Sequence, residues 1–167
     1  MISHASKYYV PLDQLSQKTA EMMDATIFYT AAAQHPPKAI KIDFFFMHCV
    51  NASIFWPTFN ALSWLSDESK CRLLEWKGRL DLVMYVSRGT PPLLKEEIEA
   101  YTAETGKDLT WGKLGDRLFK VKRDDGHAVK LLRVLGTAER VCRGLEGGKV
   151  QKEQRSEGRR AGKECME

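Results

Sequence analysis

Two polar side chains interrupt the most apolar stretch of the chain, residues 42–65. His48 and Asn51 are three residues apart, so on a helix they lie on the same face. A histidine there can carry a proton near neutral pH, and an asparagine beside it can position a substrate oxygen. The same pattern also fits a buried histidine and asparagine that satisfy each other or a nearby carbonyl.

A second histidine, His127, follows an Asp-Asp-Gly turn and precedes the last apolar helical pattern of the chain. A neutral imidazole at a helix N-terminus can act as a base or as a hydrogen-bond donor. Lys130 follows three residues later and Arg133 six residues later, and either basic side chain can contact an anionic or phenolate substrate. The alternative is a surface histidine at a junction between a loop and a helix.

A third group of polar residues lies on the helix expected after Ser66. Asp81 and Tyr85 are four residues apart among apolar neighbours, so they can line a pocket in which Tyr85 is a phenolic donor. Arg79 belongs to a second set, whose spacing is typical of a solvated, ion-paired helix face.

The remaining acidic and aromatic candidates have simpler interpretations. Asp43 lies about 140° round a helix from His48, so the two form no local dyad, and we expect Asp43 near a helix start. Several aromatic residues are expected in the core, although their rings also suit a flat aromatic ligand: Trp56, Trp64, Trp76 and residues 44–46.

Helical spacing of apolar residues runs through most of the sequence, and no alternating stretch is long enough to predict a strand. The predicted fold class is therefore all-α, an orthogonal or irregular bundle of five or six helices within residues 1–143. Helices are expected between residues 11 and 36, over 38–56, from 66 to 88, over 93–101 and 109–121, and from 126 to 143. Residues 144–167 hold five glycines and 11 charged residues, which predicts a disordered tail.

Composition excludes several classes of protein. The chain has 167 residues, with 26 Lys and Arg against 22 Asp and Glu, and the charges alternate, so we expect no nucleic-acid partner. Four cysteines without a CxxC pair and an N-terminus without an apolar leader predict a cytoplasmic protein. Residues 42–65 are long enough to span a bilayer, but their polar groups make a buried helix the better interpretation. No flavin, dinucleotide, phosphate-loop or metal motif is found.

Three separated blocks, KIDFFFMHCVNASIFWP, LLEWKGRLDLVMYVSRGTP and DDGHAVKLLRVLGTAERVC, together resemble the C-terminal portion of fungal questin oxidase-like proteins. The resemblance covers about residues 8–143, and members of that family are substantially longer. It implies an NADPH-dependent monooxygenase of polyketide secondary metabolism, which inserts oxygen from O2 into anthraquinone-type compounds in a Baeyer–Villiger-type oxidation. It further implies that no flavin is required, since a substrate reduced to its hydroquinone can react with O2 directly.

Carried onto this sequence, the resemblance predicts three catalytic residues: His48, His127 and Tyr85. It also predicts six residues that bind substrate: Asn51, Asp43, Trp76, Arg79, Asp81 and Lys130. The expected partner is a small aromatic polyketide, with no metal and no membrane, and exposed apolar surface would favour self-association. The alternative functions are a non-catalytic helical module that binds an aromatic ligand or a protein partner, and a membrane-associated protein that uses residues 42–65.

Overall fold

A computed structural model describes residues 2–102, 110–121 and 125–164, with side chains for 3–102, 110–121 and 125–145. These residues form an all-α fold without strands, as the sequence predicts. The elements, in chain order, are α1 (Ile2–Ala5), the 3-10 turn η1 (Leu12–Gln14), α2 (Leu15–Ala32), α3 (Phe44–Ser53), α4 (Phe55–Ala61), α5 (Asp67–Ser87), α6 (Lys95–Glu99), α7 (Trp111–Phe119) and α8 (His127–Glu164).

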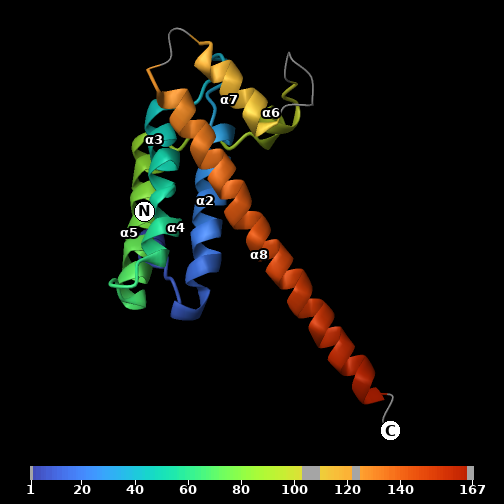
Figure 1. The fold of residues 1–167 in the computed structure, drawn as a ribbon. Coiled ribbons are helices and arrows are strands. Elements are labelled where there is room, and N and C mark those ends of the chain that lie inside the picture. Colours follow the sequence, from blue (N-terminus) through green and yellow to red (C-terminus); the bar gives the residue numbers. More distant parts are fainter. Residues whose placement is uncertain (1, 103–109, 122–124, 165–167) are drawn as a thin grey trace.

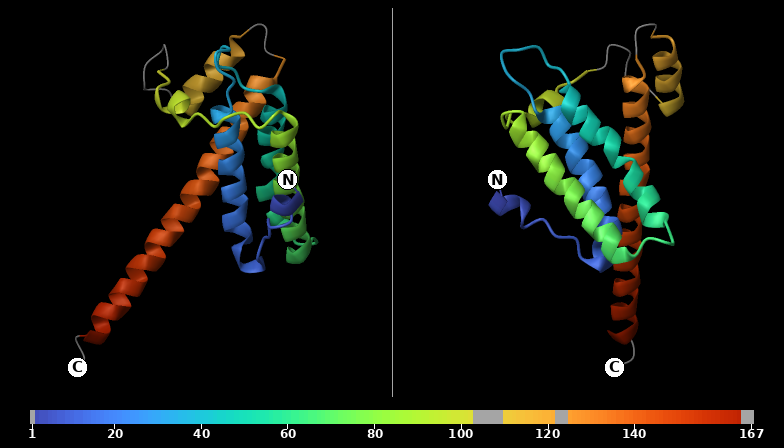
Figure 2. Two further views of the ribbon diagram at one scale, coloured as in Figure 1. Left: turned by 180° about the vertical axis from the view of Figure 1, so that it is seen from behind. Right: turned by 90° about the vertical axis from the view of Figure 1, so that its left-hand side faces the viewer.

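Helix α2 is the centre of the bundle. It packs against α3, α5 and α8, while α8 also packs against α3 and α7 (Figure 1). The segment before α2 runs beside α5, and α8 extends well beyond the other helices (Figure 2). The hydrophobic core lies where these helices meet and includes Val10, Met22, Met23, Val50, Cys71, Leu74, Val134 and Ala138.

The helix predicted over 38–56 begins later and is divided in two. It begins at Phe44 because Asp43 caps it, with Asp43 Oδ1 accepting hydrogen bonds from the backbone N–H groups of Phe45 (2.8 Å) and Phe46 (3.2 Å). The predicted position of Asp43 near a helix start is therefore confirmed. The break at Ile54 has a local cause, because Pro57 has no N–H to donate to the carbonyl of Ser53.

Helix α5 begins at the predicted cap, since Ser66 Oγ accepts a hydrogen bond from the backbone N–H of Ser69. Its buried face differs from the apolar stripe that helical spacing predicts, of which only Leu74 is buried: Leu73, Leu74, Trp76, Leu80, Val83 and Met84. It buries Lys70, Cys71, Leu74, Lys77 and Asp81, and it exposes Leu73, Trp76, Leu80 and Val83.

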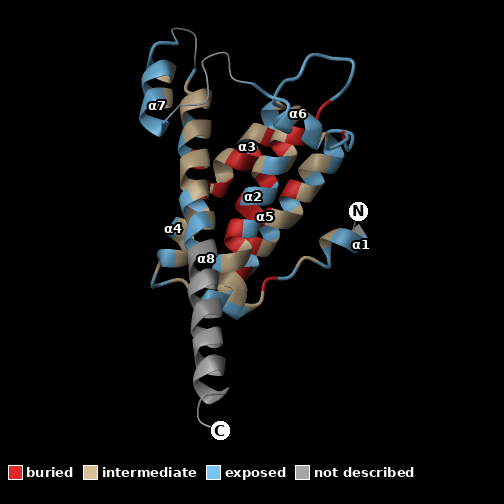
Figure 3. Cartoon of the chain, turned by 90° about the vertical axis from the view of Figure 1, so that its right-hand side faces the viewer, coloured by how far each residue is buried: buried red, intermediate tan, exposed pale blue. Residues whose placement is uncertain are grey.

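The expected aromatic core is therefore wrong for several rings, and Figure 3 shows the buried residues gathered where α2, α3 and α5 face one another. Phe46 is fully buried and Trp56 is partly buried, but Trp64 is 77% exposed and Trp76 is 61% exposed. Trp64 lies in the turn before α5, and Trp76 lies on the outer face of that helix. Helical spacing fixes which residues share a face but does not decide which face turns inward.

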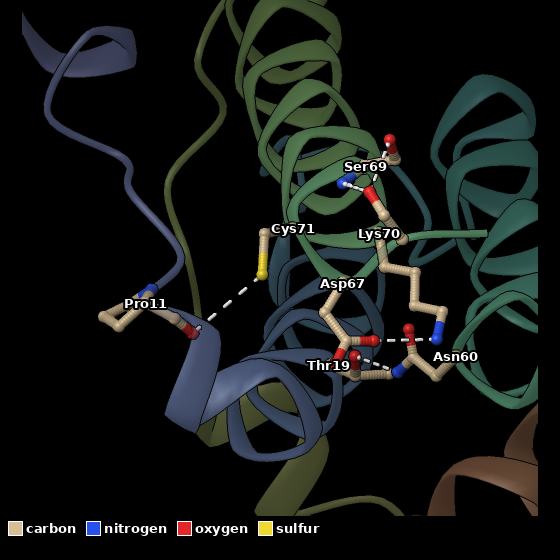
Figure 4. A network of polar contacts seen from close by, with 8 residues as sticks. Pro11, Thr19, Asn60, Asp67, Ser69, Lys70 and Cys71 are labelled. Carbon is tan, nitrogen blue, oxygen red and sulfur yellow. Dashed lines mark hydrogen bonds and ion pairs between the residues drawn. The ribbon is translucent and has the colours of Figure 1, made fainter. Parts of the chain in front are cut away.

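Polar contacts fasten the lower end of the bundle (Figure 4). Asn60 Nδ2 donates to Thr19 Oγ1 over 2.9 Å, which joins α4 to α2. At the start of α5, Lys70 pairs with Asp67 over 2.8 Å. The first contact fixes α4 on α2, whereas the second lies within the first turn of α5.

The backbone of α8 continues as a helix to Glu164, and the disorder predicted for residues 144–167 stays a prediction. The segment is rich in Glu, Gln, Lys and Arg, which have high helix propensity, and its backbone can propagate a helix that has already been started. A domain boundary at residue 143 stays a prediction. In the part of the chain that the structure describes, no helix is both long and apolar enough to cross a membrane.

Candidate functional site

Helices α3 and α8 bring His48 and His127 together. Their ring centroids are 5.4 Å apart and their planes are at 85°, so one imidazole edge meets the other imidazole face. Phe44, one turn before His48 on α3, contacts both rings, with centroid distances of 4.6 Å to His48 and 5.3 Å to His127. The meeting of two predicted catalytic histidines is a property of the fold, because no local spacing connects them.

Asp125 orients the His127 side chain. Its Oδ1 accepts a hydrogen bond from the backbone N–H of His127 (3.3 Å) and also contacts the ring Nδ1 of the same residue. The hydrogen bond with the His127 ring is the main reason that the pKa of Asp125 is lowered. With Nδ1 engaged, Nε2 is the ring nitrogen of His127 that has no hydrogen-bond partner among the described residues, so it can face a ligand. This contact was not predicted from the sequence, although an aspartate two residues before a histidine at a helix start indicates a possible hydrogen-bond partner.

A cavity of about 430 Å³ lies beside His48. Its lining residues come from α3, α4 and α8, with one in the break between α3 and α4: His48, Asn51, Ala52, Ile54, Phe55, Lys130, Arg133 and Val134. As their spacing predicts, His48 and Asn51 share this wall. Lys130 and Arg133, the two basic residues that the sequence offers as contacts for an anionic substrate, both line this cavity.

Asn51 is the unusual polar group of this cavity. Its side-chain Oδ1 and Nδ2 are both buried, and neither has a hydrogen-bond partner among the described residues. A buried amide normally satisfies both atoms, so this one can donate to and accept from a bound molecule. The alternative in which His48 and Asn51 satisfy each other is therefore not what the structure shows.

The charge of the cavity favours an anion. Lys130 and Arg133 lie on adjacent turns of α8, and neither forms an ion pair with any residue that the structure describes. Apolar walls from Ile54, Phe55 and Val134 complete the surface. The arrangement can transfer protons through two imidazoles, hydrogen-bond a substrate oxygen through Asn51, and stabilise negative charge that develops on the substrate.

Three other predicted residues line a different cavity. Tyr85, Arg79 and Asp81 belong to a cavity of about 550 Å³ between α2, α5 and the N-terminal segment. The Tyr85 hydroxyl donates to the carbonyl of Pro91, so its donor is already used. Tyr85 is thus not brought to the histidine pair.

Arg79 holds the N-terminal segment on α5. Its guanidinium donates to the carbonyls of Ala5 (3.2 Å) and Tyr8 (3.1 Å), and it pairs with Glu75 over 3.2 Å. The ring of Tyr8 then covers Gly78, where a Cβ atom would lie 2.4 Å from Tyr8 Cε1. These contacts give Arg79 protein partners in place of a ligand.

Asp81 is buried and forms an ion pair with Lys77, while Thr26 Oγ1 donates to the same carboxylate over 3.2 Å. Burial raises the pKa of Asp81, and the positive charge of Lys77 opposes this rise. Asp43, besides capping α3, pairs with Arg88 over 3.1 Å. Neither Asp43 nor the exposed Trp76 lines the cavity beside His48.

Comparison with known proteins identifies the family to which the chain belongs. The questin oxidase-like family model matches residues 1–135, which is most of the chain and includes both histidines. The chain belongs to the questin oxidase-like family. Among its relatives, Oxidoreductase AflY of Aspergillus parasiticus is 41% identical over 88% of this chain and 30% of AflY.

Two further relatives have more explicit names. Questin oxidase of Aspergillus fumigatus is 39% identical over 87% of this chain and 32% of its own length. Baeyer-Villiger oxidase mdpL of Emericella nidulans is 38% identical over 89% of this chain and 33% of its own length. This questin oxidase-like chain therefore spans about a third of the length of the curated relatives that it matches.

Proposed function

We propose that this chain carries the acid–base part of a Baeyer–Villiger-type oxidation of an aromatic polyketide ketone in fungal secondary metabolism, with NADPH and O2 as cosubstrates. The observation that carries the proposal is the meeting of His48 and His127 beside a cavity that contains the unsatisfied Asn51 amide. The names of the relatives, questin oxidase and Baeyer-Villiger oxidase, support the reaction class.

The overall reaction defines what the residues must do. One atom of O2 enters between the carbonyl carbon of the substrate and its neighbouring carbon, and the other atom leaves as water. NADPH supplies a hydride and the medium supplies a proton, so that two electrons balance the reduction of O2. Substrate ketone, O2, NADPH and a proton thus give an ester or lactone, water and NADP⁺.

In this proposal each residue at the site has one task. His48, Asn51 and Lys130 line the cavity, whereas His127 and Phe44 do not line it but contact the His48 ring. Asn51 Nδ2 donates a hydrogen bond to the substrate ketone, and Lys130 stabilises an ionised phenol of the same molecule. Nε2 of His127, oriented by Asp125, takes a proton from the substrate, and His48 returns one to the oxygen that leaves. The apolar walls and Phe44 limit the access of water.

The residues of α8 fit a phosphate group of NADPH but provide no dinucleotide-binding turn. The sequence holds no glycine-rich turn of the dinucleotide-binding type, so recognition through helix-terminal amides has no support. Lys130 and Arg133, without ion pairs among the described residues, fit a phosphate group. Since Lys130 is assigned to the substrate phenol, we propose that Arg133 holds one phosphate of the cosubstrate at the edge of the cavity.

Isotope labelling tests the proposal. The purified chain is incubated with a hydroxyanthraquinone, NADPH and ¹⁸O2, and a product with a single ¹⁸O atom in its new ester or lactone is expected by mass spectrometry. His48→Asn and His127→Asn should each lower the rate by about 10²-fold or more. His35→Asn, at an exposed histidine outside the cavity, is the matched control and should keep the rate. Absence of labelled product from the unmodified chain, or unchanged rates in both variants, would refute the proposal.

A further inference from the structure

A second cavity is larger than the one beside His48. It lies between α2, α5 and the N-terminal segment and has a volume of about 550 Å³. Four aromatic side chains line it: Tyr8, Phe28, Tyr29 and Tyr85. Apolar pockets of this size with aromatic walls accept flat rings. The reaction proposed above makes no use of this space.

Two lining residues carry buried polar atoms that lack a partner. The Tyr29 hydroxyl and Asp81 Oδ1 are buried and make no hydrogen bond of regular geometry to any described residue; the buried Cys49 thiol lies near both side chains and contributes to their pKa shifts. The Asp81 side chain is only 8% exposed, and its other oxygen, Oδ2, is fully used by Lys77 and Thr26. One unsatisfied donor and one unsatisfied acceptor therefore belong to residues of the same cavity. A molecule with one hydroxyl and one carbonyl group would satisfy both.

The charge around this cavity excludes an anion. Glu21 and Asp81 both line it, and Arg79, its lining cation, is held by protein carbonyls and Glu75. Burial, followed by the negative charges of Glu21, Asp81 and Glu75, raises the pKa of Tyr8 to about 12. Tyr8 therefore stays a neutral phenol in a negative surrounding, which is the opposite of the cavity beside Lys130 and Arg133.

We infer that the cavity between α2 and α5 is a second binding site, for an uncharged, planar aromatic ketone that also carries a hydroxyl group. The ligand hydroxyl donates to Asp81 Oδ1, and the ligand ketone accepts from the Tyr29 hydroxyl. The ring lies among Tyr8, Phe28 and Tyr85. This site is separate from His48 and His127, and binding there requires neither NADPH nor turnover.

Three tricyclic probes of the same shape test the inference by calorimetry. They are 2-hydroxy-9-fluorenone, 9-fluorenone without the hydroxyl, and 9-fluorenone-2-carboxylate, which is an anion at pH 7. The hydroxylated ketone should bind about 10-fold more tightly than 9-fluorenone, since one added hydrogen bond to a buried carboxylate supplies that factor. The carboxylate should be excluded from this cavity.

Filling variants locate the bound probe. Ala25, an exposed residue on α2, lines this cavity, whereas Ala52 lines the cavity beside His48. Ala25→Leu should abolish binding of 2-hydroxy-9-fluorenone, and Ala52→Leu should leave it unchanged. Equal affinity of the wild type and Ala25→Leu would overturn the inference whatever the outcome of the labelling experiment, because this measurement does not depend on turnover.

Two tyrosine variants test the hydrogen bond. Tyr29→Phe removes the unsatisfied hydroxyl, so it should weaken the probe about 10-fold without lowering the stability of the free protein. Tyr85→Phe removes a hydroxyl that is already bonded to Pro91, so it should lower stability and keep the affinity. Full affinity in Tyr29→Phe, or equal affinity for the two uncharged probes, would contradict the assigned contacts.

Discussion

Lys77 and Asp81, one turn apart on α5, form an ion pair inside the bundle, where their side chains are only 3% and 8% exposed. Separating such a pair costs free energy, because a charge left alone in the interior has no water to stabilise it. The carboxylate also accepts from Thr26 on α2, so the pair joins the two helices.

Removing one partner of this pair should therefore be far more damaging than removing both. Lys77→Met leaves a buried carboxylate and should lower the free energy of unfolding by about 3–5 kcal/mol. The double variant Lys77→Met/Asp81→Leu should recover most of that loss. The exposed pair Lys95–Glu99 has the same spacing and provides the control, since Lys95→Met should cost under about 1 kcal/mol. Urea unfolding measures all three, and similar losses in both single variants would contradict the argument.

Asp43 should contribute to stability mainly as a helix cap. Asp43→Ala removes the acceptor for the N–H groups of Phe45 and Phe46 and should cost about 1 kcal/mol. Asp43→Asn keeps a cap oxygen and should cost much less. Arg88→Met keeps the cap, removes the surface ion pair and the contact of the guanidinium with the Phe45 ring, and should cost about 1 kcal/mol or less. Thermal unfolding in which Asn is as damaging as Ala would show that the charge, and not the cap, is decisive.

Asn51 should lower the stability of the free protein, because its buried amide is unsatisfied. Asn51→Leu should raise the free energy of unfolding by about 1 kcal/mol while it abolishes product formation. Asn60→Leu is the contrasting variant, since Asn60 Nδ2 donates to Thr19 and its loss should destabilise the protein. If Asn51→Leu destabilises the fold as Asn60→Leu does, the amide has a structural role.

Alkaline pH should weaken the fold through Tyr8. A tyrosine is charged only when it is deprotonated, and the folded state raises the pKa of Tyr8 from 10.0 to about 12, chiefly through burial. The resulting stability is complete below pH 10, where neither state is ionised. It is lost as pH rises toward 12, because the unfolded chain releases the proton first. Tyr8→Phe should make the decline of unfolding free energy between pH 10 and 12 shallower, and an unchanged slope would contradict this.

The outer face of α5 should drive self-association. Leu73, Trp76, Leu80 and Val83 recur at helical spacing, and all of them are exposed. Trp76→Glu/Leu80→Glu should shift the protein toward monomer in light scattering at high concentration. Ser63→Glu adds a charge outside α5 and should leave the distribution unchanged. A wild-type protein that is monomeric at all concentrations would contradict this prediction.

Local signals in the sequence predicted local structure well. Ser66 caps α5 and Asp43 caps α3, because a cap depends on one side chain and the next three residues. The shared face of His48 and Asn51 also follows from spacing alone. The apposition of His48 and His127 agrees with their predicted common site, although their roles stay predictions.

Long-range relationships could not be read in the same way. Tyr85 and Asn51 were expected to bind one substrate, yet they line different cavities, because nothing in local spacing tells which neighbour each helix face meets. Helical spacing predicts that apolar side chains of α5 face the core, but Lys77 and Asp81 are buried there. Their mutual ion pair takes the place of a hydrophobic contact. The partnership of Asp125 and His127 was local but was overlooked among consecutive acids.

The contact of Tyr8 with Gly78 makes the first residues of the chain part of a cavity wall. Because Arg79 fastens this segment through the carbonyls of Ala5 and Tyr8, a purification tag or a protease that acts there alters the volume available to a ligand. Recombinant versions with different N-terminal extensions should therefore differ in affinity for uncharged aromatic probes while they keep the same affinity for anions. Affinities measured with different recombinant versions would then differ because of the residues added before the N-terminal segment.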